Sequence, residues 1–132
     1  MSKLQSLLED FEKGLLRLSE ALAREKDDFI RDSAIKRFEI LFDLGWKTLK
    51  AFLQEERTVK CVSPKGCFRE AYKQGLIEYD NFWIEICNMR NYATHAYDEQ
   101  LADYIYNQLP KVLASFNELC AAMKREAESE EM

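Results

Sequence analysis

The sequence has few of the residues that form tight turns. Its 132 residues include only 4 glycines and 2 prolines, whereas a β-sandwich or β-barrel needs such residues at its many turns. This shortage argues against an all-β fold and favours long helices. A chain of this length forms one domain with a sizeable core, so neither disulfide bonds nor a structural metal is needed for stability.

Long apolar runs are also absent. No window approaches the roughly 18 to 20 uninterrupted apolar residues that a membrane-spanning helix requires. The N-terminus carries Glu9, Asp10 and Glu12 where a signal peptide would be apolar. We therefore predict a cytoplasmic protein that does not associate with membranes.

The usual metal and nucleotide motifs are missing as well. His95 is the only histidine, and Cys61, Cys67, Cys87 and Cys120 show no C-x2-C pairing, so we predict reduced, partly buried thiols and no metal site. The sequence has no phosphate-binding loop and no pair of carboxylates spaced to hold catalytic magnesium. The chain is therefore not a nucleotidyltransferase by itself, and no cofactor is expected.

The net charge of -5 conceals a basic middle third. Residues 31–73 contain ten Lys or Arg and six Asp or Glu, a net charge of +4, while both flanking segments are acidic. Broad binding to duplex DNA is disfavoured, because it depends on many basic contacts to phosphates. A smaller basic cleft that faces Arg90 across the bundle can still accept one phosphate or an acidic partner.

Apolar residues recur at three- and four-residue steps, which is the periodicity of amphipathic helices. A shorter helix should begin at Ser63-Pro64, where the hydroxyl can cap the helix and proline suits its first position, and should stop near Gly75. We predict an all-α, up-and-down four-helix bundle with this short additional helix between the second and third long helices. The expected long helices cover approximately residues 4–22, 28–55, 81–92 and 98–125.

Two positions inside the helices and the C-terminal segment add detail to this prediction. Gly45 lowers helix propensity by about 1 kcal/mol relative to alanine, which suggests a close helix crossing there; the alternative is a glycine that the helix simply tolerates. Pro110 must bend or divide the last helix, because proline removes an internal hydrogen bond. We assign residues 1–125 to the helical domain and residues 126–132 to an acidic, disordered tail that has nothing to bury.

Residues 89–98 concentrate the polar chemistry of the chain. Arginine binds phosphate through a planar fork of donors, and histidine accepts a proton near neutral pH. Together Arg90 and His95 suit metal-independent RNA cleavage, in which a base removes the 2'-hydroxyl proton and a cation stabilises the pentacovalent phosphorane. On a straight helix the two side chains point about 140° apart. Either the helix loosens around residues 92–94, or the two residues converge across two subunits of a dimer.

Structural roles for the same residues stay open. A lone histidine near a helix end is often a capping or packing residue, and Arg90 can pair with an acid such as Glu85 or Asp98. Tyr92 and Tyr97 can likewise be ordinary packing residues. The spacing of these residues does not decide between the two interpretations.

The segment Arg90-Asn91-Tyr92-Ala93-Thr94-His95-Ala96-Tyr97 has the pattern R-x4-H-x-Y. It resembles the motif of HEPN domains, and the chain looks most similar to their nucleotidyltransferase substrate-binding branch. Residues 35–50 resemble the second helix of that family, and residues 63–77 resemble its short connecting helix. The resemblance extends over roughly residues 4–123.

The resemblance implies a homodimer encoded beside a minimal nucleotidyltransferase as a two-component system. In toxin–antitoxin relatives the HEPN protein is a ribonuclease, and the partner enzyme silences it by transferring AMP to the motif tyrosine (AMPylation). By position, Arg90 and His95 would be the catalytic pair, Asn91 would support them, and Tyr97 would accept the modification.

The resemblance also assigns a supporting role to Asp43 and Lys47, which lie one helical turn apart. Their alternative role is a solvated ion pair, which contributes about 0.3 to 0.5 kcal/mol. Three hypotheses for the whole chain follow: a substrate- or nucleotide-binding partner of a nucleotidyltransferase, a metal-independent ribonuclease, and an inert helical dimerisation module. The first is our preferred interpretation.

Overall fold

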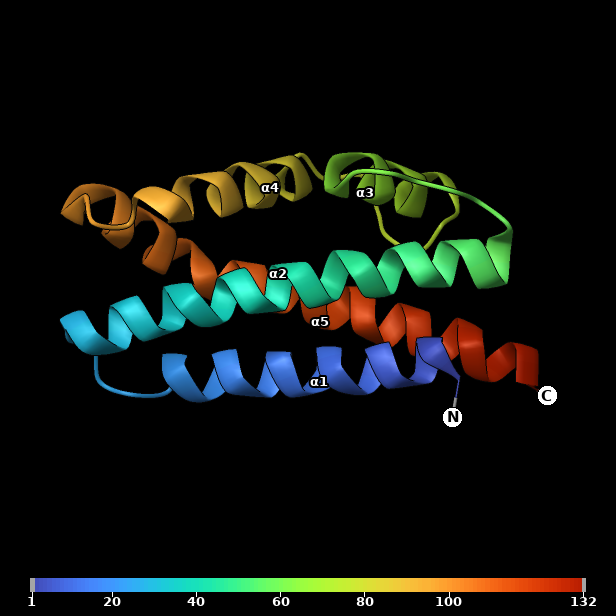
Figure 1. The fold of residues 1–132 in the computed structure, drawn as a ribbon, viewed down its shortest axis with the longest axis horizontal. Helices are drawn as coiled ribbons and strands as arrows, with labels where there is room; N and C mark the ends of the chain where they lie inside the picture. Colours follow the sequence, from blue (N-terminus) through green and yellow to red (C-terminus); the bar gives the residue numbers. More distant parts are fainter. Residues whose placement is uncertain (1, 132) are drawn as a thin grey trace.

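The computed structural model describes residues 2–131, and these residues are helical with short connections (Figure 1). This confirms the predicted all-α fold. No helix in this part of the chain is long and apolar enough to cross a bilayer. The helices are α1 (Lys3–Leu22), α2 (Asp28–Arg57), α3 (Pro64–Lys73), α4 (Phe82–Tyr92), the 3-10 helix η1 (Ala93–His95) and α5 (Glu99–Glu131).

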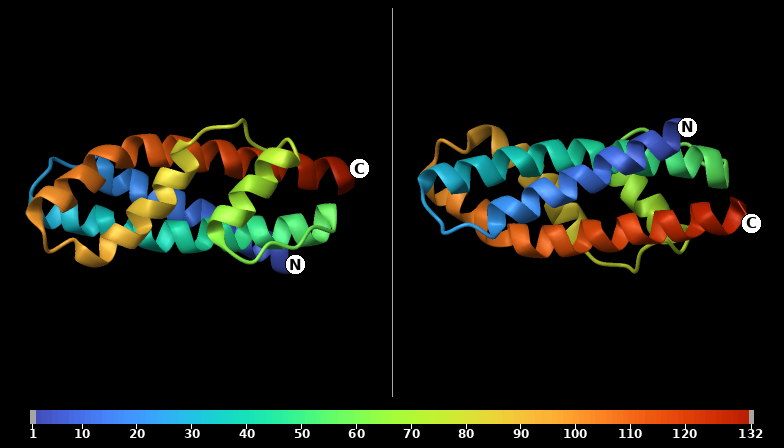
Figure 2. Two further views of the ribbon diagram at one scale, coloured as in Figure 1. Left: turned by 90° about the horizontal axis from the view of Figure 1, so that it is seen from above. Right: turned by 90° about the horizontal axis from the view of Figure 1, so that it is seen from below.

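The three long helices α1, α2 and α5 pack against one another, while α3 and α4 lie across α2 and α5 (Figure 2). The chain direction alternates from α1 to α2, α4 and α5, as in an up-and-down bundle (Figure 1). Helix α4, Phe82–Tyr92, agrees with the predicted range of 81–92 and is much shorter than α1, α2 and α5. The short helix α3 lies in the same layer as α4, and the two together cover one side of the bundle, at the top of Figure 1.

The predicted helix starts agree with the observed caps. The Ser63 hydroxyl accepts a hydrogen bond from the Gly66 amide at 3.1 Å, at the start of α3. The Asp80 carboxylate accepts one from the Phe82 amide at 2.9 Å, just before α4. These bonds satisfy amide groups that have no partner inside the first helical turn. Gly75, with φ of 77°, reverses the chain after α3 in a conformation that suits glycine.

The Phe116 ring of α5 lies at the centre of the core. It meets the rings of Phe11 on α1, Phe68 on α3 and Trp83 on α4 with centroids 5.8, 6.3 and 5.4 Å apart. On α2 it rests against Gly45, where an added Cβ would lie 2.7 Å from the ring. The predicted close crossing at Gly45 is therefore confirmed, and it brings α1 to α5 together around one side chain.

The course of α5 can be compared with the predictions for Pro110 and for the C-terminal segment. The helix continues without division through Pro110, and its axis changes direction in its N-terminal half (Figure 2). It also extends to Glu131, across positions expected to form a disordered tail. Glu126, the first residue of this stretch, forms an ion pair with Arg57 of α2 at 3.0 Å. The last tail residue, Met132, lies outside the described residues.

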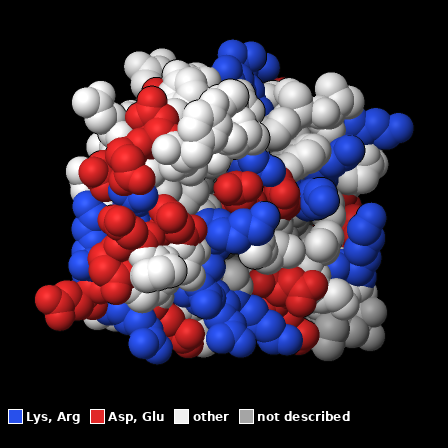
Figure 3. Space-filling view, turned by 60° about the vertical axis from the view of Figure 1, so that its left-hand side comes forward, with Lys and Arg blue, Asp and Glu red and all other residues white. Residues whose placement is uncertain are grey.

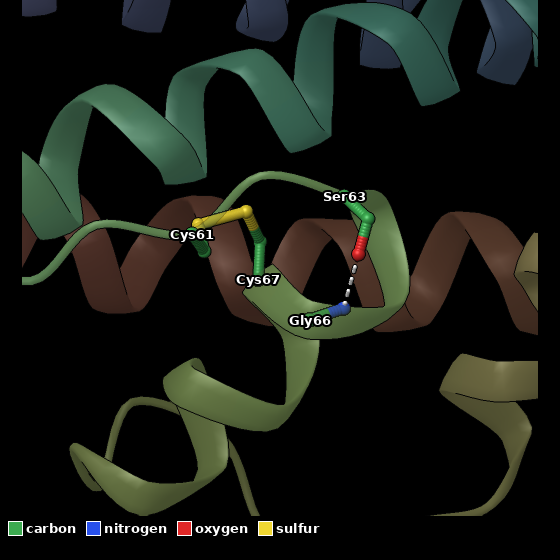
Figure 4. The surroundings of a disulfide bond; sticks show 4 residues. All are labelled: Cys61, Ser63, Gly66 and Cys67. Atoms are coloured by element: carbon green, nitrogen blue, oxygen red, sulfur yellow. Dashed lines mark hydrogen bonds between the residues drawn. A yellow bond between two sulfur atoms is a disulfide. The ribbon is translucent and has the colours of Figure 1, made fainter.

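The prediction for the cysteines is wrong for one pair. Cys61 and Cys67 form a disulfide bond, with Cα atoms 5.2 Å apart (Figure 4). The cap at Ser63 turns the chain into α3, so Cys67 on the first turns of that helix faces Cys61 in the preceding segment. Cys87 and Cys120 are free and buried, as predicted. Burial raises the pKa of both thiols to about 11, so they stay protonated at neutral pH.

Candidate functional site

The R-x4-H-x-Y motif spans the junction between α4 and α5. Arg90 lies in the last turn of α4, His95 ends η1, and Tyr97 lies in the turn before α5. The helix therefore loosens after Tyr92, which was one of the two geometries expected from the spacing. The Asp98 carboxylate caps α5 by accepting a hydrogen bond from the Leu101 amide at 3.1 Å, so the turn ends at a fixed point.

Arg90 faces two carboxylates of α2. Its Nη1 lies 3.7 Å from Glu39 Oε2 and its Nη2 lies 3.7 Å from Asp43 Oδ2. Both separations exceed hydrogen-bonding distance, so the guanidinium is held by charge without close donor contacts. Among residues 2–131, its buried Nε atom has no hydrogen-bond partner. The Arg90 side chain is 25% exposed, so it remains accessible from one side.

These contacts correct three predictions. The pairs of Arg90 are Glu39 and Asp43, not Glu85 or Asp98. Asp43 pairs with Arg90 because both face the α2–α4 contact, and no ion pair joins it to Lys47 among residues 2–131. The part of the basic middle third that faces Arg90 is thus acidic, so the cleft expected there lacks the extra positive charge.

Glu85 has a different partner. Its carboxylate accepts a hydrogen bond from the Tyr104 hydroxyl of α5 at 2.7 Å. This bond raises the pKa of Tyr104 to about 12, since it favours the protonated phenol beside a negative charge. The bond also ties α4 to α5 close to the motif.

His95 and Tyr97 lie together on the surface. His95 Nδ1 is 3.3 Å from the Tyr97 hydroxyl, and the two rings meet edge to face at 5.9 Å. The Tyr97 side chain is 82% exposed. This pair offers a nucleophilic hydroxyl beside a group that can accept its proton.

One chain does not bring the whole motif together. Within residues 2–131, no hydrogen bond or ion pair joins Arg90 to His95. Asn91 is exposed, and its backbone carbonyl accepts a hydrogen bond from the Thr94 hydroxyl at 3.0 Å. On the face shown in Figure 3, basic and acidic side chains alternate without forming one extended basic surface.

Sequence reasoning missed a buried arginine that fixes the start of α5. Arg31 of α2 is only 3% exposed and donates hydrogen bonds to Glu99 at 2.6 Å, Asp103 at 3.2 Å and Asp32 at 3.1 Å. Lys26 also donates to Asp103, at 3.1 Å. This cluster holds the first turn of α5 against α2, directly after the turn that carries Tyr97.

A sequence signal for this cluster exists. Arg31 lies on the same helical face as the buried residues Ala34, Ile35 and Phe38, so a charged residue occupies an apolar stripe. A buried arginine requires acidic partners, because an unpaired charge is costly to remove from water. Glu99 and Asp103, one turn apart at the start of α5, are such partners.

The fold and the motif together define a class of protein: a helical bundle with R-x4-H-x-Y at the junction of its last two helices. The chain belongs to the family described as nucleotidyltransferase substrate binding protein like, whose family model matches residues 6–125. This result confirms the resemblance drawn from the sequence.

The sequence is also similar to that of the probable ribonuclease HepT of Haemophilus influenzae, with 31% identity over 90 residues. The match covers 65% of this chain and 62% of the relative. The match therefore spans less than two thirds of the length of that protein.

Two solved structures share the fold. A protein from Thermus thermophilus matches with a TM-score of 0.83 and 32% identity over 86% of this chain and 98% of its own. A Haemophilus influenzae protein, whose structure is described as the fold of a substrate binding domain of a nucleotidyltransferase, matches with a TM-score of 0.67 and 25% identity. That match covers 92% of this chain and 96% of the other.

The Arg31 cluster predicts how stability depends on pH. Hydrogen bonds from Arg31 hold the pKa of Glu99 below its ordinary value, and those from Lys26 and Arg31 do the same for Asp103. The unfolded chain therefore binds more protons at acidic pH, so this contribution is present above the unfolded pKa of about 4 and is lost as pH falls through the folded values. Urea unfolding between pH 7 and pH 3 should show this decline.

The variant Glu99→Gln isolates this effect. It should be less stable than the wild type at pH 7 and should lose less of its remaining stability on acidification. Glu20→Gln is the matched control, because the ion pair of Glu20 within the described part of the chain is an exposed one with Arg17 at 3.8 Å. Equal acid dependence in wild type and Glu99→Gln would show that the cluster does not stabilise the fold.

Proposed function

We propose that this chain is the substrate- or nucleotide-binding partner of a separately encoded minimal nucleotidyltransferase, in a two-component system of the toxin–antitoxin type. Membership of the nucleotidyltransferase substrate binding family supports the partner role. The observation that carries the proposal is the exposed Tyr97 hydroxyl at 3.3 Å from His95. An enzyme that acts on this chain can reach that hydroxyl without unfolding the bundle.

The chemistry proposed for Tyr97 is AMP transfer from ATP. The phenol oxygen attacks the α-phosphorus, a P–O bond to tyrosine forms, and the bond to the leaving pyrophosphate breaks. The phenol must lose its proton, and His95 Nδ1 is within reach to accept it when that nitrogen is unprotonated. The partner enzyme would supply the magnesium site that residues 2–131 of this chain do not contain.

Co-expression with the nucleotidyltransferase encoded nearby tests this role. The two proteins should co-purify, and the intact mass of this chain should rise by one or more AMP groups. Tyr97→Phe should abolish that increase because it removes the attacking oxygen.

Tyr79→Phe is the matched control for this experiment. Tyr79 is also exposed, at 68%, but lies in the α3–α4 connection, so its loss should leave the added mass unchanged. An unmodified wild-type chain, or a Tyr97→Phe chain that gains the same mass, would contradict the assignment of Tyr97. Failure to co-purify with the enzyme would contradict the partner role.

A second candidate function is metal-independent RNA cleavage. The similarity to the probable ribonuclease HepT favours it, and so does the partly exposed guanidinium of Arg90, whose Nη atoms lie 3.7 Å from Glu39 and Asp43 and so retain donors for a phosphate. In this reaction a base removes the 2'-hydroxyl proton, that oxygen attacks the adjacent phosphorus, and an acid protonates the departing 5'-oxygen. Since each chain has one histidine, we propose that a homodimer supplies both proton-transfer groups.

Cleavage of a labelled single-stranded RNA in excess chelator tests this candidate. The purified wild type should cut the RNA, and His95→Ala should lower the rate by about 10²-fold or more, the usual contribution of a general acid or base. His95 is exposed, so the thermal unfolding midpoint should not change.

Thr94→Ala is the neighbouring control and should retain cleavage, because the Thr94 hydroxyl bonds only to the Asn91 carbonyl among the described contacts. Cleavage that survives His95→Ala, or that depends on added metal, would rule out the proposed chemistry.

A further inference from the structure

A second candidate site lies away from the motif. A cavity of about 540 Å³ is formed by the start of α1, the C-terminal half of α2 and residues 60–62. The motif junction is at the opposite end of the bundle (Figure 1). The volume falls within the roughly 300 to 1,000 Å³ range of small-molecule sites.

The charges around this cavity are unlike those of the whole protein. Lys3, Lys47, Lys50 and Lys60 line it, with Glu55 as the one carboxylate among its lining residues. The chain as a whole has a net charge of -5. None of the four lysines makes an ion pair within the described part of the chain, although 24 acidic residues are available in the sequence. Four unpaired ammonium groups around one cavity favour a ligand with several negative charges.

An aromatic surface lies beside these charges. Trp46 lines the cavity and is half-buried, so one part of the indole packs on the core while another part remains accessible. Lys50 Nζ lies 5.8 Å from the centre of the Trp46 ring. A planar base that stacks on this indole would therefore place attached phosphates near the lysines. Gln54, also in the lining, offers amide groups to the edge of a base.

A disulfide bond fixes the part of the cavity wall that residues 60–62 form. Lys60, Cys61 and Val62 belong to the segment that the disulfide to Cys67 attaches to α3 (Figure 4). Val62 is 88% exposed, although it is apolar and lines the cavity. A preformed wall lowers the cost of ordering a site when a ligand binds.

From these observations we infer that the cavity between α1, α2 and residues 60–62 binds a nucleoside triphosphate, with the base on Trp46 and the phosphates on the lysines. The inference deepens the proposed partner role, because it locates the nucleotide that such a subunit would bind. A mononucleotide fits better than an extended RNA, since the four lysines line one cavity.

Calorimetric titration of the isolated, oxidised chain with ATP tests this inference. The wild type should bind ATP, and binding should weaken as salt concentration rises. Lys47→Ala/Lys50→Ala should weaken binding by about 10-fold or more through loss of charged hydrogen bonds to phosphate. Trp46→Leu should weaken it by about 10-fold through loss of base stacking.

The matched control for the double lysine variant is Lys13→Ala/Lys36→Ala. It removes two exposed lysines outside the cavity and should retain wild-type affinity.

Further ligands separate the alternatives. Tripolyphosphate that binds as tightly as ATP would overturn the role of the base, and an RNA oligonucleotide that binds more tightly would overturn the preference for a mononucleotide. Absence of ATP binding to the wild type, or cavity variants that bind like the wild type, would overturn the site itself. Circular dichroism would verify that every variant is folded.

The outcome is independent of the Tyr97 experiment. The titration contains no nucleotidyltransferase, and Tyr97→Phe should bind ATP as the wild type does. A chain that is modified on Tyr97 but does not bind ATP would refute only the cavity site, whereas ATP binding without modification or co-purification would refute only the partner role.

Discussion

The structure depends on one close approach, between the Phe116 ring and the backbone of Gly45. Because glycine has no Cβ, α5 comes near enough to α2 for this ring to contact α1, α3 and α4 as well. Aromatic contacts of this kind contribute both buried area and preferred edge-to-face geometry. The two short helices are thereby attached to the same core as the three long ones, and the end of α4 is held at a defined place over α2.

The junction between α4 and α5 follows from that arrangement. On the α4 side, Glu39 and Asp43 of α2 face Arg90, and on the α5 side Arg31 of α2 binds Glu99 and Asp103. Helix α2 thus holds both elements that flank η1. The turn between them leaves His95 and Tyr97 on the surface, where the proposed partner enzyme would act. Rigid helices that hold an exposed turn provide a suitable arrangement for recognition by another protein.

The helices could be predicted from the sequence, whereas several contacts between them could not. Periodicity and capping residues are local, so they predicted the all-α class and the start of α3. The close crossing at Gly45 was predicted from a different signal, the unfavourable helix propensity of a glycine inside a long helix. The Cys61–Cys67 bond and the partners of Arg90 depend on how separate elements meet, and periodicity carries no such information. The motif was visible in the sequence, whereas the basic cavity at the other end required residues from α1, α2 and the α2–α3 connection to be brought together.

We propose that the turn containing His95 and Tyr97 is the surface that a partner nucleotidyltransferase contacts. Hydrogen–deuterium exchange of this chain, measured alone and with the enzyme encoded nearby, tests it most directly. Exchange in residues 92–98 should be slower when the enzyme is present, with little change in the buried centre of α2. Unchanged exchange in residues 92–98, with protection confined to another surface, would contradict it.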